Sequence, residues 1–393
     1  MKILSLLLSV GLASAGPTSL PRRQDVGAAT TKKLVVSSPG QVAAYEFNGA
    51  QFKPIGTPAT EEGKHFSWLV FKEPNHLYGA NENANETRHW TVEDDGTIKV
   101  VGDVIGSTGV VHTAFNKDKN VIVGAAYGNN GTIDVWDVAE DGSLKLKKTL
   151  QVPQLTQPGA NPKRQEAPHN HQANLDPTGG YFAINDLGSD KIHVLSTKDY
   201  ELVNHVDVEA GCGPRHGGFV GEAGKQATHY MVVCELSNKI QVFGLTYEDT
   251  SVQFQKTQTI STFKDDTAPA GAAAGELVIS NDSSSVYVTN RLTGDEADNI
   301  AYFSFTECGN LEFKQTVSTA GKNPRMASLS TDQSILFSTN LAAGEGDNTN
   351  RLVAYSRSKE GALSELPVAL EELSATEKSS PDPIGPSFIQ EIS

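Results

Sequence analysis

The chain has 393 residues, enough for one large β domain or two smaller domains, and its 38% apolar content with 36 Gly excludes a disordered protein. The formal net charge of −15 argues against binding to nucleic acid or to anionic membrane surfaces, because both require a basic face. The only cysteines are Cys212, Cys234 and Cys308, so one disulfide is possible between an undetermined pair, and their spacing predicts no metal site.

The N-terminus is typical of a secretory signal peptide. A single Lys2 precedes the apolar run Ile3–Leu12, and the small residues 13–15 form a cleavage site. We expect residues 1–15 to be a signal peptide and residues 16–31, which include a dibasic Arg22-Arg23, to be a flexible segment. A buried N-terminal strand is the alternative. The apolar run is too short to span a bilayer, and no other stretch approaches the roughly 20 apolar residues that a membrane span requires.

Three sequons agree with secretion. Asn85, Asn130 and Asn281 each begin an Asn-X-Ser/Thr triplet at a predicted turn, where a glycan can be accommodated. We therefore expect a secreted, extracellular glycoprotein, with association with a cell wall as one option.

After residue 32, seven segments share one outline: an apolar run, a polar turn and a second apolar run. They are Leu34–Phe47, Leu77–Val92, Val121–Val138, Tyr181–Ser196, Tyr230–Leu245, Val286–Phe305 and Leu336–Ser356. The period of about 45–60 residues suits a four-stranded propeller blade with loop insertions.

In five units a further strand is predicted after a Gly-containing or acidic turn, within residues 96–100, 142–144, 200–203, 309–313 and 361–363. Each unit thus supplies the second, third and fourth strands of a blade. Helical periodicity is weak throughout, and the one helix candidate is Pro367–Glu377.

An inner strand is expected before each apolar run. Six candidates are Phe66–Phe71, His112–Phe115, His171–Leu175, His216–Val220, Glu276–Ser280 and Met326–Leu329. The seventh, Ser387–Ile392, lies at the far C-terminus and would complete the blade that begins at Leu34. The sequence therefore predicts an all-β, seven-bladed β-propeller over residues 32–393, closed by a C-terminal inner strand in the first blade. A pair of two-sheet sandwiches is the competing architecture, but the period is too regular and the chain too long for it.

Polar residues recur where inner strands begin and where the next strands end. In a propeller these positions converge at one mouth of the central channel. The strand starts carry His112, His171, Arg215-His216, Glu276 and Arg325, and the neighbouring strand ends carry Glu82, Tyr127, Asp186, Glu235 and Arg291. Three of them, His171, Glu276 and Arg325, share one register, ten residues before the following run.

A polar ring alone is ordinary for a water-filled channel, but three arginines and three histidines exceed that requirement. Arginine suits capture of carboxylate or phosphate, and histidine suits proton transfer. His216 should face away from Arg215 by strand alternation and pack structurally. Asp186 and Asp190 are expected to cap turns, and His169 to lie in a loop.

The motifs carry a family resemblance. P-H-x-H-Q at 168–172, G-x-G-P-R-H at 211–216, A-G-E-L-V-I-S-N-D at 274–282 and G-x-N-P-R at 321–325 are the most specific. From about residue 34 onward, the chain resembles the seven-bladed propeller lactonase family, which includes 6-phosphogluconolactonases and fungal carboxy-cis,cis-muconate cyclases.

This resemblance implies that His171, Arg215, Glu235 and Arg291 are catalytic. Glu276 and Arg325 belong to the motifs of the lactonase-like branch, and with His112, Tyr127 and Glu82 they form the expected substrate-binding set. A carboxylate among guanidiniums is a weak base, so His171 is the better proton-transfer group and Glu235 orients it.

We therefore expect a secreted, monomeric enzyme that opens or forms a small lactone bearing a carboxylate or a sugar, as a lactone hydrolase or a muconate cycloisomerase. No cofactor, metal or nucleic acid partner is expected. The alternative is a non-catalytic secreted or surface propeller that binds a small anion or a protein.

Overall fold

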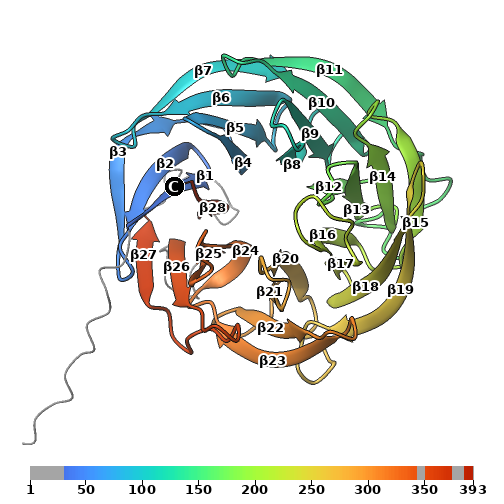
Figure 1. Cartoon of the computed structure of the whole chain (residues 1–393). Coiled ribbons are helices and arrows are strands. Elements are labelled where there is room, and N and C mark those ends of the chain that lie inside the picture. The colour runs from blue at the N-terminus through green and yellow to red at the C-terminus, as the bar shows by residue number, and fades with distance from the viewer. Residues whose placement is uncertain (1–30, 343–349, 374–384, 393) are drawn as a thin grey trace, which may run out of the picture. The chain divides into compact units, whose positions relative to one another are not determined.

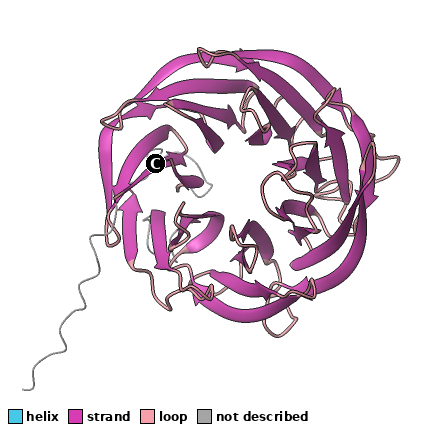
Figure 2. Ribbon diagram, in the orientation of Figure 1, coloured by secondary structure: helices cyan, strands magenta, loops and turns pink. Residues whose placement is uncertain are grey.

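The computed structural model describes residues 31–342, 350–373 and 385–392. The predicted signal peptide and nearly all of the segment after it lie outside these ranges. The described residues form strands, turns and loops with no helix (Figure 2). The strands make seven four-stranded antiparallel sheets arranged as blades around a central axis (Figure 1), which confirms the seven-bladed propeller.

The blades are numbered here in chain order, and each is given from its inner to its outer strand. Blade 1 is β28 (Phe388–Glu391), β1 (Lys32–Ser38), β2 (Gln41–Phe47) and β3 (Phe52–Thr60); blade 2 is β4 (Phe66–Lys72), β5 (His76–Asn81), β6 (Glu86–Val92) and β7 (Ile98–Ile105). Blade 3 is β8 (Val110–Phe115), β9 (Val121–Ala126), β10 (Thr132–Val138) and β11 (Leu144–Gln151); blade 4 is β12 (Asn170–Leu175), β13 (Tyr181–Asp186), β14 (Lys191–Ser196) and β15 (Leu202–Asp207). Blade 5 is β16 (Pro214–Val220), β17 (His229–Cys234), β18 (Lys239–Tyr247) and β19 (Val252–Ser261); blade 6 is β20 (Ala273–Ile279), β21 (Ser285–Arg291), β22 (Asn299–Phe305) and β23 (Leu311–Ser318). Blade 7 is β24 (Lys322–Leu329), β25 (Ile335–Ala342), β26 (Asn350–Ser356) and β27 (Ala369–Leu373).

The C-terminal strand closes the ring as predicted. β28 pairs antiparallel with β1, from Leu34 opposite Glu391 to Ser37 opposite Phe388. The two ends of the folded chain are therefore held in one sheet, and Ser387, just before β28, is brought to the axis of the propeller.

The hydrophobic core is divided into seven clusters, one between each pair of adjacent blades. Because side chains alternate along a strand, each blade sends one set to each neighbour. In β1, for example, Val36 packs toward blade 7 and Val35 toward blade 2. Burial on both faces explains why the middle strands are continuous apolar runs.

The outer strands differ most from the prediction. β3 and β19 were not expected, because both are rich in exposed polar residues and lack a clear apolar run. The fourth strand of blade 7 is β27, not residues 361–363. There, Gly361 has φ +94° and its carbonyl accepts a hydrogen bond from Tyr287, so the segment is a turn with a single bridge between Arg357 and Leu363.

The predicted helix Pro367–Glu377 is also wrong over its described part. Ala369–Leu373 pairs with β26 as a strand, because the open edge of β26 supplies backbone partners that a short isolated helix would lack. Residues 374–377 lie outside the described ranges.

Six of the seven inner strands contain one extra residue at the same place. The register shifts just after the strand begins in β4, β8, β12, β16, β20 and β24. A β-bulge of this kind leaves a residue unpaired and re-aims its side chain. The bulges contain Ser67, Val111, His171, Arg215-His216, Gly275-Glu276 and Arg325.

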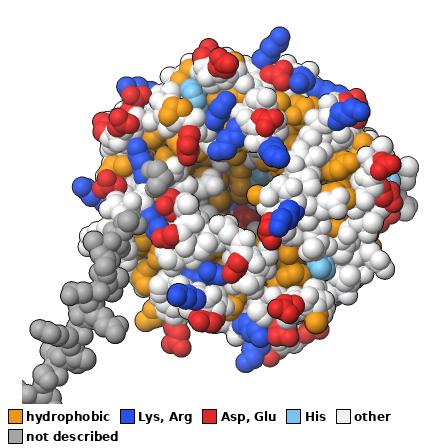
Figure 3. Space-filling view, viewed as in Figure 1, with side chains coloured by type: hydrophobic (Ala, Val, Ile, Leu, Met, Phe, Trp, Pro, Cys, Tyr) orange, Lys and Arg blue, Asp and Glu red, His pale blue; other side chains and the backbone are white. Residues whose placement is uncertain are grey.

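No helix in the described ranges is long and apolar enough to cross a membrane. Figure 3 shows one face of the ring hollowed at its centre, with acidic and basic side chains around the hollow.

Closure by the C-terminal strand makes Phe388 important for stability. Its side chain is 1% exposed and meets Trp68 edge-to-face with ring centroids 5.3 Å apart. We expect Phe388→Ala to lower the free energy of unfolding by about 3–5 kcal/mol, because a buried aromatic is lost from between two blades. Thermal and denaturant unfolding measure this. Gln390→Ala, an exposed position on the same strand, is the control, and an equal effect of both substitutions would contradict the closure role.

Candidate active site

A cavity of about 490 Å³ opens where the inner strands begin. Its walls come from blades 2 to 7 and from the loop before β12. It is lined by Glu82, Asn83, Thr108, Gly109, Val111, Tyr127, Gly128, Arg164, His171, Arg215, Glu235, Arg291 and Arg325. Seven of the nine residues assigned to the site from the sequence are in this lining, namely His171, Arg215, Glu235, Arg291, Arg325, Tyr127 and Glu82.

The other two site residues lie outside the lining. His112 is buried, with its ring 4.1 Å from that of Trp68, while the bulge at β8 presents Val111 to the cavity instead. Glu276 is 4% exposed and reaches the cavity only through other side chains. Direct contact of either residue with a bound substrate is therefore not supported.

Glu235, directly after β17, is the point where three guanidiniums meet. Arg164 Nη2 donates a hydrogen bond of 2.6 Å to its Oε1, and its Oε2 lies 2.9 Å from Arg215 Nε and 2.8 Å from Arg291 Nη2. Burial alone would raise the pKa of Glu235, but attraction to Arg291, Arg215 and Arg164 outweighs it and lowers the pKa to about 2. Glu235 is thus an ionised anchor at neutral pH and a poor base.

The four arginines of the cavity differ in depth. The side chains are 3% exposed for Arg215, 13% for Arg291, 21% for Arg325 and 40% for Arg164. Arg215 is enclosed, so the other three are the guanidiniums that a ligand in the cavity can reach. A Cβ at Gly275 would lie 3.1 Å from Arg291 Nε and 2.4 Å from Thr289 Oγ1, so a glycine in this bulge leaves room for Arg291.

A second carboxylate, Glu82, lies across the mouth. Both of its oxygens accept hydrogen bonds from Arg325, and its Oε1 is 2.9 Å from His65 Nδ1. Burial opposes ionisation, but Arg325 and His65 hold the pKa of Glu82 well below its ordinary range. His65 Nε2 is 3.0 Å from Ser387 Oγ, so the closing segment supports this side of the site.

Two histidines and a carboxylate form a hydrogen-bonded chain under the cavity. His171 Nδ1 is 3.2 Å from His216 Nε2, and His216 Nδ1 is 2.8 Å from Glu276 Oε1. The prediction that His216 faces away from Arg215 is wrong. The bulge in β16 leaves both residues without strand partners, so the usual alternation fails there.

Burial and the neighbouring guanidinium determine the charge of the two imidazole rings. Burial, followed by the nearby charge of Arg215, lowers the pKa of both His171 and His216 well below the ordinary value of 6.5. Both imidazoles are therefore neutral at neutral pH. His171 lines the cavity, and its Nδ1 is occupied by His216, so its Nε2 is the nitrogen left for a ligand.

The residues around His171 have structural roles. His169 stacks on Tyr127 with ring centroids 4.3 Å apart and bonds the Tyr127 carbonyl and Glu166. Asp186 accepts hydrogen bonds from the backbone of His169 and, in its own turn, of Gly188, as expected for a carboxylate that caps a turn. Asp190 instead accepts from the backbone of Gly211 and Gly213, 21 and 23 residues further along the chain, and so joins two loops.

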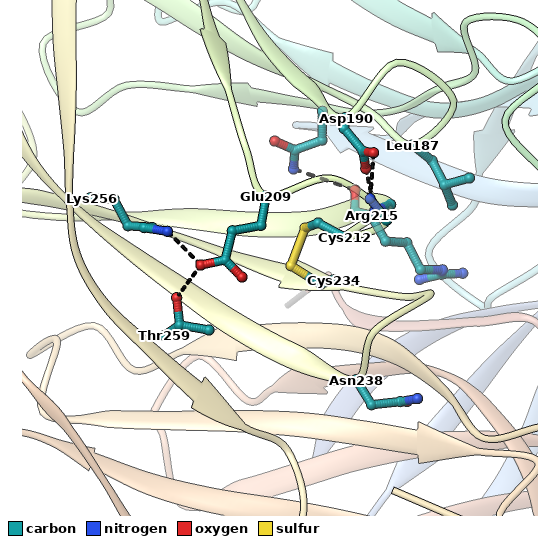
Figure 4. Close-up of a disulfide and its surroundings, with 12 residues drawn as sticks. Leu187, Asp190, Glu209, Cys212, Arg215, Cys234, Asn238, Lys256 and Thr259 are labelled. Carbon is teal, nitrogen blue, oxygen red and sulfur yellow. Dashed lines mark hydrogen bonds and ion pairs between the residues drawn. A yellow bond between two sulfur atoms is a disulfide. The ribbon is translucent and has the colours of Figure 1, made fainter. Parts of the chain in front are cut away.

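The structure pairs Cys212 with Cys234, and Figure 4 shows this disulfide with Asp190 and Arg215 beside it. Cys234 directly precedes Glu235, and Cys212 lies in the loop that leads into Arg215. The crosslink therefore ties together the two backbone segments that carry the Arg215–Glu235 ion pair. Cys308 is exposed and has no disulfide.

Sequence reasoning missed Arg164 and His65. Arg164 lies in the long loop between β11 and β12, where no strand register applies, and His65 comes just before β4. The sequence offered one signal for His65, since it directly precedes the inner strand β4 as His169 directly precedes β12. Within the described ranges, no group of three or more His, Cys, Asp or Glu side chains could hold a metal ion.

The profile of the family described as lactonase, 7-bladed β-propeller, matches residues 26–373. The chain belongs to this family. The predicted resemblance to this family is thereby confirmed.

Several proteins are similar to this chain. A probable 6-phosphogluconolactonase of Arthroderma benhamiae is 31% identical over 232 residues, which is 58% of this chain and 57% of that protein. The 6-phosphogluconolactonase of Bacillus subtilis is 32% identical over 255 residues, or 64% of this chain and 67% of that protein. The solved periplasmic gluconolactonase PpgL of Pseudomonas aeruginosa superposes with a TM-score of 0.73 at 22% identity, covering 93% of this chain and 99% of that one, and shows the shared fold.

The ion cluster on Glu235 predicts sensitivity to acid. The pKa of Glu235 is lowered from its ordinary value of 4.5 to about 2 in the folded protein. Ionisation of Glu235 therefore contributes its full stabilisation at pH values above 4.5, and this stabilisation is lost as the pH falls toward 2. We expect Glu235→Gln to lower the free energy of unfolding by about 3–5 kcal/mol at neutral pH, because three guanidiniums lose their counter-charge.

Between about pH 5 and pH 2, the free energy of unfolding of this variant should fall by less than that of the wild type. Melting temperatures measured by circular dichroism across this range test both statements. Glu222→Gln, at an exposed carboxylate, is the control. An equally steep acid dependence in Glu235→Gln and the wild type would show that Glu235 does not govern acid stability.

Proposed function

We propose that this chain hydrolyses a small lactone that carries an anionic group, in the cavity at the mouth of the propeller channel. The observation that carries the proposal is a neutral imidazole, His171, lining one cavity together with four arginines, of which Arg164, Arg291 and Arg325 are within reach of a ligand. A neutral imidazole can accept a proton from water, and guanidiniums can stabilise the oxyanion that forms at a lactone carbonyl.

The charge of the cavity supports an anionic substrate. Four arginines and the two ionised carboxylates Glu82 and Glu235 give a net charge of 4 − 2 = +2, within a chain of formal net charge −15. A positive cavity in an acidic protein attracts small anions over the rest of the surface. Its volume of about 490 Å³ lies in the ordinary range for small-molecule sites.

In this mechanism His171 Nε2 takes a proton from a water molecule as the water attacks the lactone carbonyl. Arg291 and Arg325 are exposed enough to bind the oxyanion and the anionic substituent, whereas Arg215 acts on the site mainly through Glu235 and its charge. Glu235 fixes the positions of Arg164, Arg215 and Arg291. The ring oxygen leaves as an alkoxide and takes up the proton that His171 returns.

The names of the relatives reported above support a sugar lactone as the substrate class, since one is described as a probable 6-phosphogluconolactonase, one as a 6-phosphogluconolactonase and the solved neighbour as a gluconolactonase. Ring closure of a carboxylated muconate is a different step, in which a carboxylate oxygen of the substrate adds to a C=C bond and the neighbouring carbon takes up a proton that the site must deliver from solvent. A propeller that binds an anion without turnover is the non-catalytic alternative, and the experiment below distinguishes all three.

The test is a panel of lactones incubated with the purified protein, with acid release measured above spontaneous hydrolysis. The panel contains glucono-δ-lactone, its 6-phosphate, a uronic acid lactone and a carboxylated muconolactone, and the open-chain carboxylated muconate is incubated in parallel. We expect His171→Ala to lower kcat by about 10²–10⁴-fold, the usual contribution of a general base. Arg291→Ala should impair the anionic lactones more than glucono-δ-lactone.

His205→Ala, at an exposed histidine on β15, is the matched control and should keep full activity. Accumulation of lactone from the muconate would indicate the cyclising reaction. Anion binding without turnover on any member of the panel would favour the non-catalytic alternative. Full activity in His171→Ala would refute the assignment of the base.

We also propose that the protein is secreted and N-glycosylated. The signal-peptide pattern, the disulfide and the three sequons support this, since disulfides persist in oxidising compartments. Asn85, Asn130 and Asn281 are all exposed, each in or beside a turn. Asn85 and Asn130 lie close in sequence to the cavity residues Asn83 and Gly128, so glycans there would flank the mouth.

Expression in a eukaryotic secretory host tests this proposal. The mature protein should appear in the medium and gain mobility on gels after treatment with an N-glycosidase. Each Asn→Gln change at a sequon should remove one step of that shift. Retention in the cells, or a mobility that the glycosidase leaves unchanged, would contradict it.

A further inference from the structure

The hydrogen-bonded chain from Glu276 through His216 to His171, called the histidine relay below, spans three blades. Its members lie in the bulges near the start of the inner strands β20, β16 and β12, and they are 4%, 2% and 8% exposed. Glu276 Oε2 has no hydrogen-bond partner among the described residues, and Leu277 N donates only to Oε1. The carboxyl group is therefore buried with one oxygen unsatisfied.

The position of one proton fixes the direction of every hydrogen bond in the histidine relay. If Glu276 is ionised, His216 Nδ1–H donates to it, His171 Nδ1–H donates to His216 Nε2, and His171 Nε2 carries a lone pair. If Glu276 is protonated, it donates to His216 Nδ1, both rings change tautomer, and His171 Nε2 carries a hydrogen. The same nitrogen is thus an acceptor in one state and a donor in the other.

The surroundings disfavour an imidazolium anywhere in the relay. Arg215 faces the rings from β16, Arg291 from β21 and Arg325 from β24, while Glu235 faces them from the end of β17 and His112 from β8. Three guanidiniums against one carboxylate leave an excess of positive charge around both rings. Burial, and after it the charge of Arg215, both lower the pKa of His216.

Glu276 has the opposite preference. Burial raises the pKa of its carboxyl to about 8, although Arg215 opposes the shift. The protonated, neutral form of Glu276 is therefore favoured by its surroundings. A proton that leaves the cavity is better placed on Glu276 than on either ring.

We propose that Glu276, reached through His216, is the terminal proton acceptor for His171, so that the site performs base and acid catalysis without forming an imidazolium. This inference rests on the proposed lactone hydrolysis. His216 and Glu276 are positioning residues in this scheme, because only His171 touches the substrate.

The proton balance is complete. As water attacks the carbonyl carbon, its proton passes to His171 Nε2, the proton on His171 Nδ1 passes to His216 Nε2, and that on His216 Nδ1 passes to Glu276. When the tetrahedral intermediate breaks the bond to the ring oxygen, the three transfers reverse and the alkoxide receives the proton from His171 Nε2. The products are a hydroxy acid and the enzyme in its starting state.

The test has one arm that does not require turnover. Protein labelled with ¹⁵N in its histidines is titrated by NMR without ligand, because ¹⁵N shifts distinguish protonated from bare ring nitrogens. We expect the rings of His171 and His216 to stay neutral from mildly acidic to alkaline pH and to change tautomer together as Glu276 ionises. Glu276→Gln should hold one tautomer throughout.

The second arm measures hydrolysis of glucono-δ-lactone and its 6-phosphate. In the wild type, kcat should rise with pH as Glu276 ionises, because only the ionised state leaves a lone pair on His171 Nε2. Glu276→Gln should lower kcat by about 10²-fold with little change in KM and should lose that rise, since an amide accepts the hydrogen bond of His216 but not its proton. Glu166→Gln, at the exposed carboxylate paired with His169, is the control.

The outcomes separate the two proposals. Rings that become imidazolium cations in the ordinary range, or tautomers that respond to pH equally in the wild type and in Glu276→Gln, overturn the relay even if lactones are hydrolysed. A coupled tautomer change without turnover of any lactone supports the relay and overturns the proposed function.

Discussion

An extra residue at the start of six inner strands decides where the polar side chains of this propeller point. In a regular strand, neighbouring residues face opposite sides, and His216 would pack between blades while Arg215 faced the channel. The bulge removes that constraint and lets both side chains reach the axis. The bulges of blades 4 to 7 carry His171, Arg215-His216, Glu276 and Arg325, whereas blades 2 and 3 carry Ser67 and Val111, so the ionisable groups gather on one side of the channel.

Charge balance explains how so many cations share this space. Glu235 forms ion pairs with three guanidiniums and Glu82 with a fourth, and each carboxylate directly follows the second strand of its blade. Removing water from such groups is unfavourable unless they are paired, so the two carboxylates are what permits the arginines to be buried. The pairing is incomplete by two charges, and that excess is available to an anionic ligand. The disulfide holds the backbone on both sides of the largest of these clusters.

The same excess of positive charge limits what the histidines can do. An isolated imidazole among these arginines would accept a proton only weakly, because the cation it forms is repelled by its neighbours. The buried carboxyl of Glu276, two hydrogen bonds away, can hold the proton instead, because burial favours the neutral form of a carboxyl group. The architecture of the propeller is what allows the connection, because the three residues come from three separate blades and meet only at the axis.

The sequence by itself determined the architecture. Seven repeats of apolar runs and turns predicted the blades, and the C-terminal run Ser387–Ile392 predicted the closure, because these features depend on local periodicity and on a count of strands. The register shared by His171, Glu276 and Arg325 also came from the sequence, since equivalent blades place equivalent residues at one level.

Only the tertiary structure decided which side chains meet. Bulges decide that His216 faces the axis and that Val111, not His112, lines the cavity. The path of a long loop brings Arg164 to Glu235, and the distance between two segments allows Cys212 to pair with Cys234. Outer strands such as β3 and β27 escaped prediction because pairing with a neighbouring strand, not an apolar pattern of their own, makes them strands. Periodicity is a local property of the chain, whereas contacts across the axis join residues far apart in sequence, and no local pattern records them.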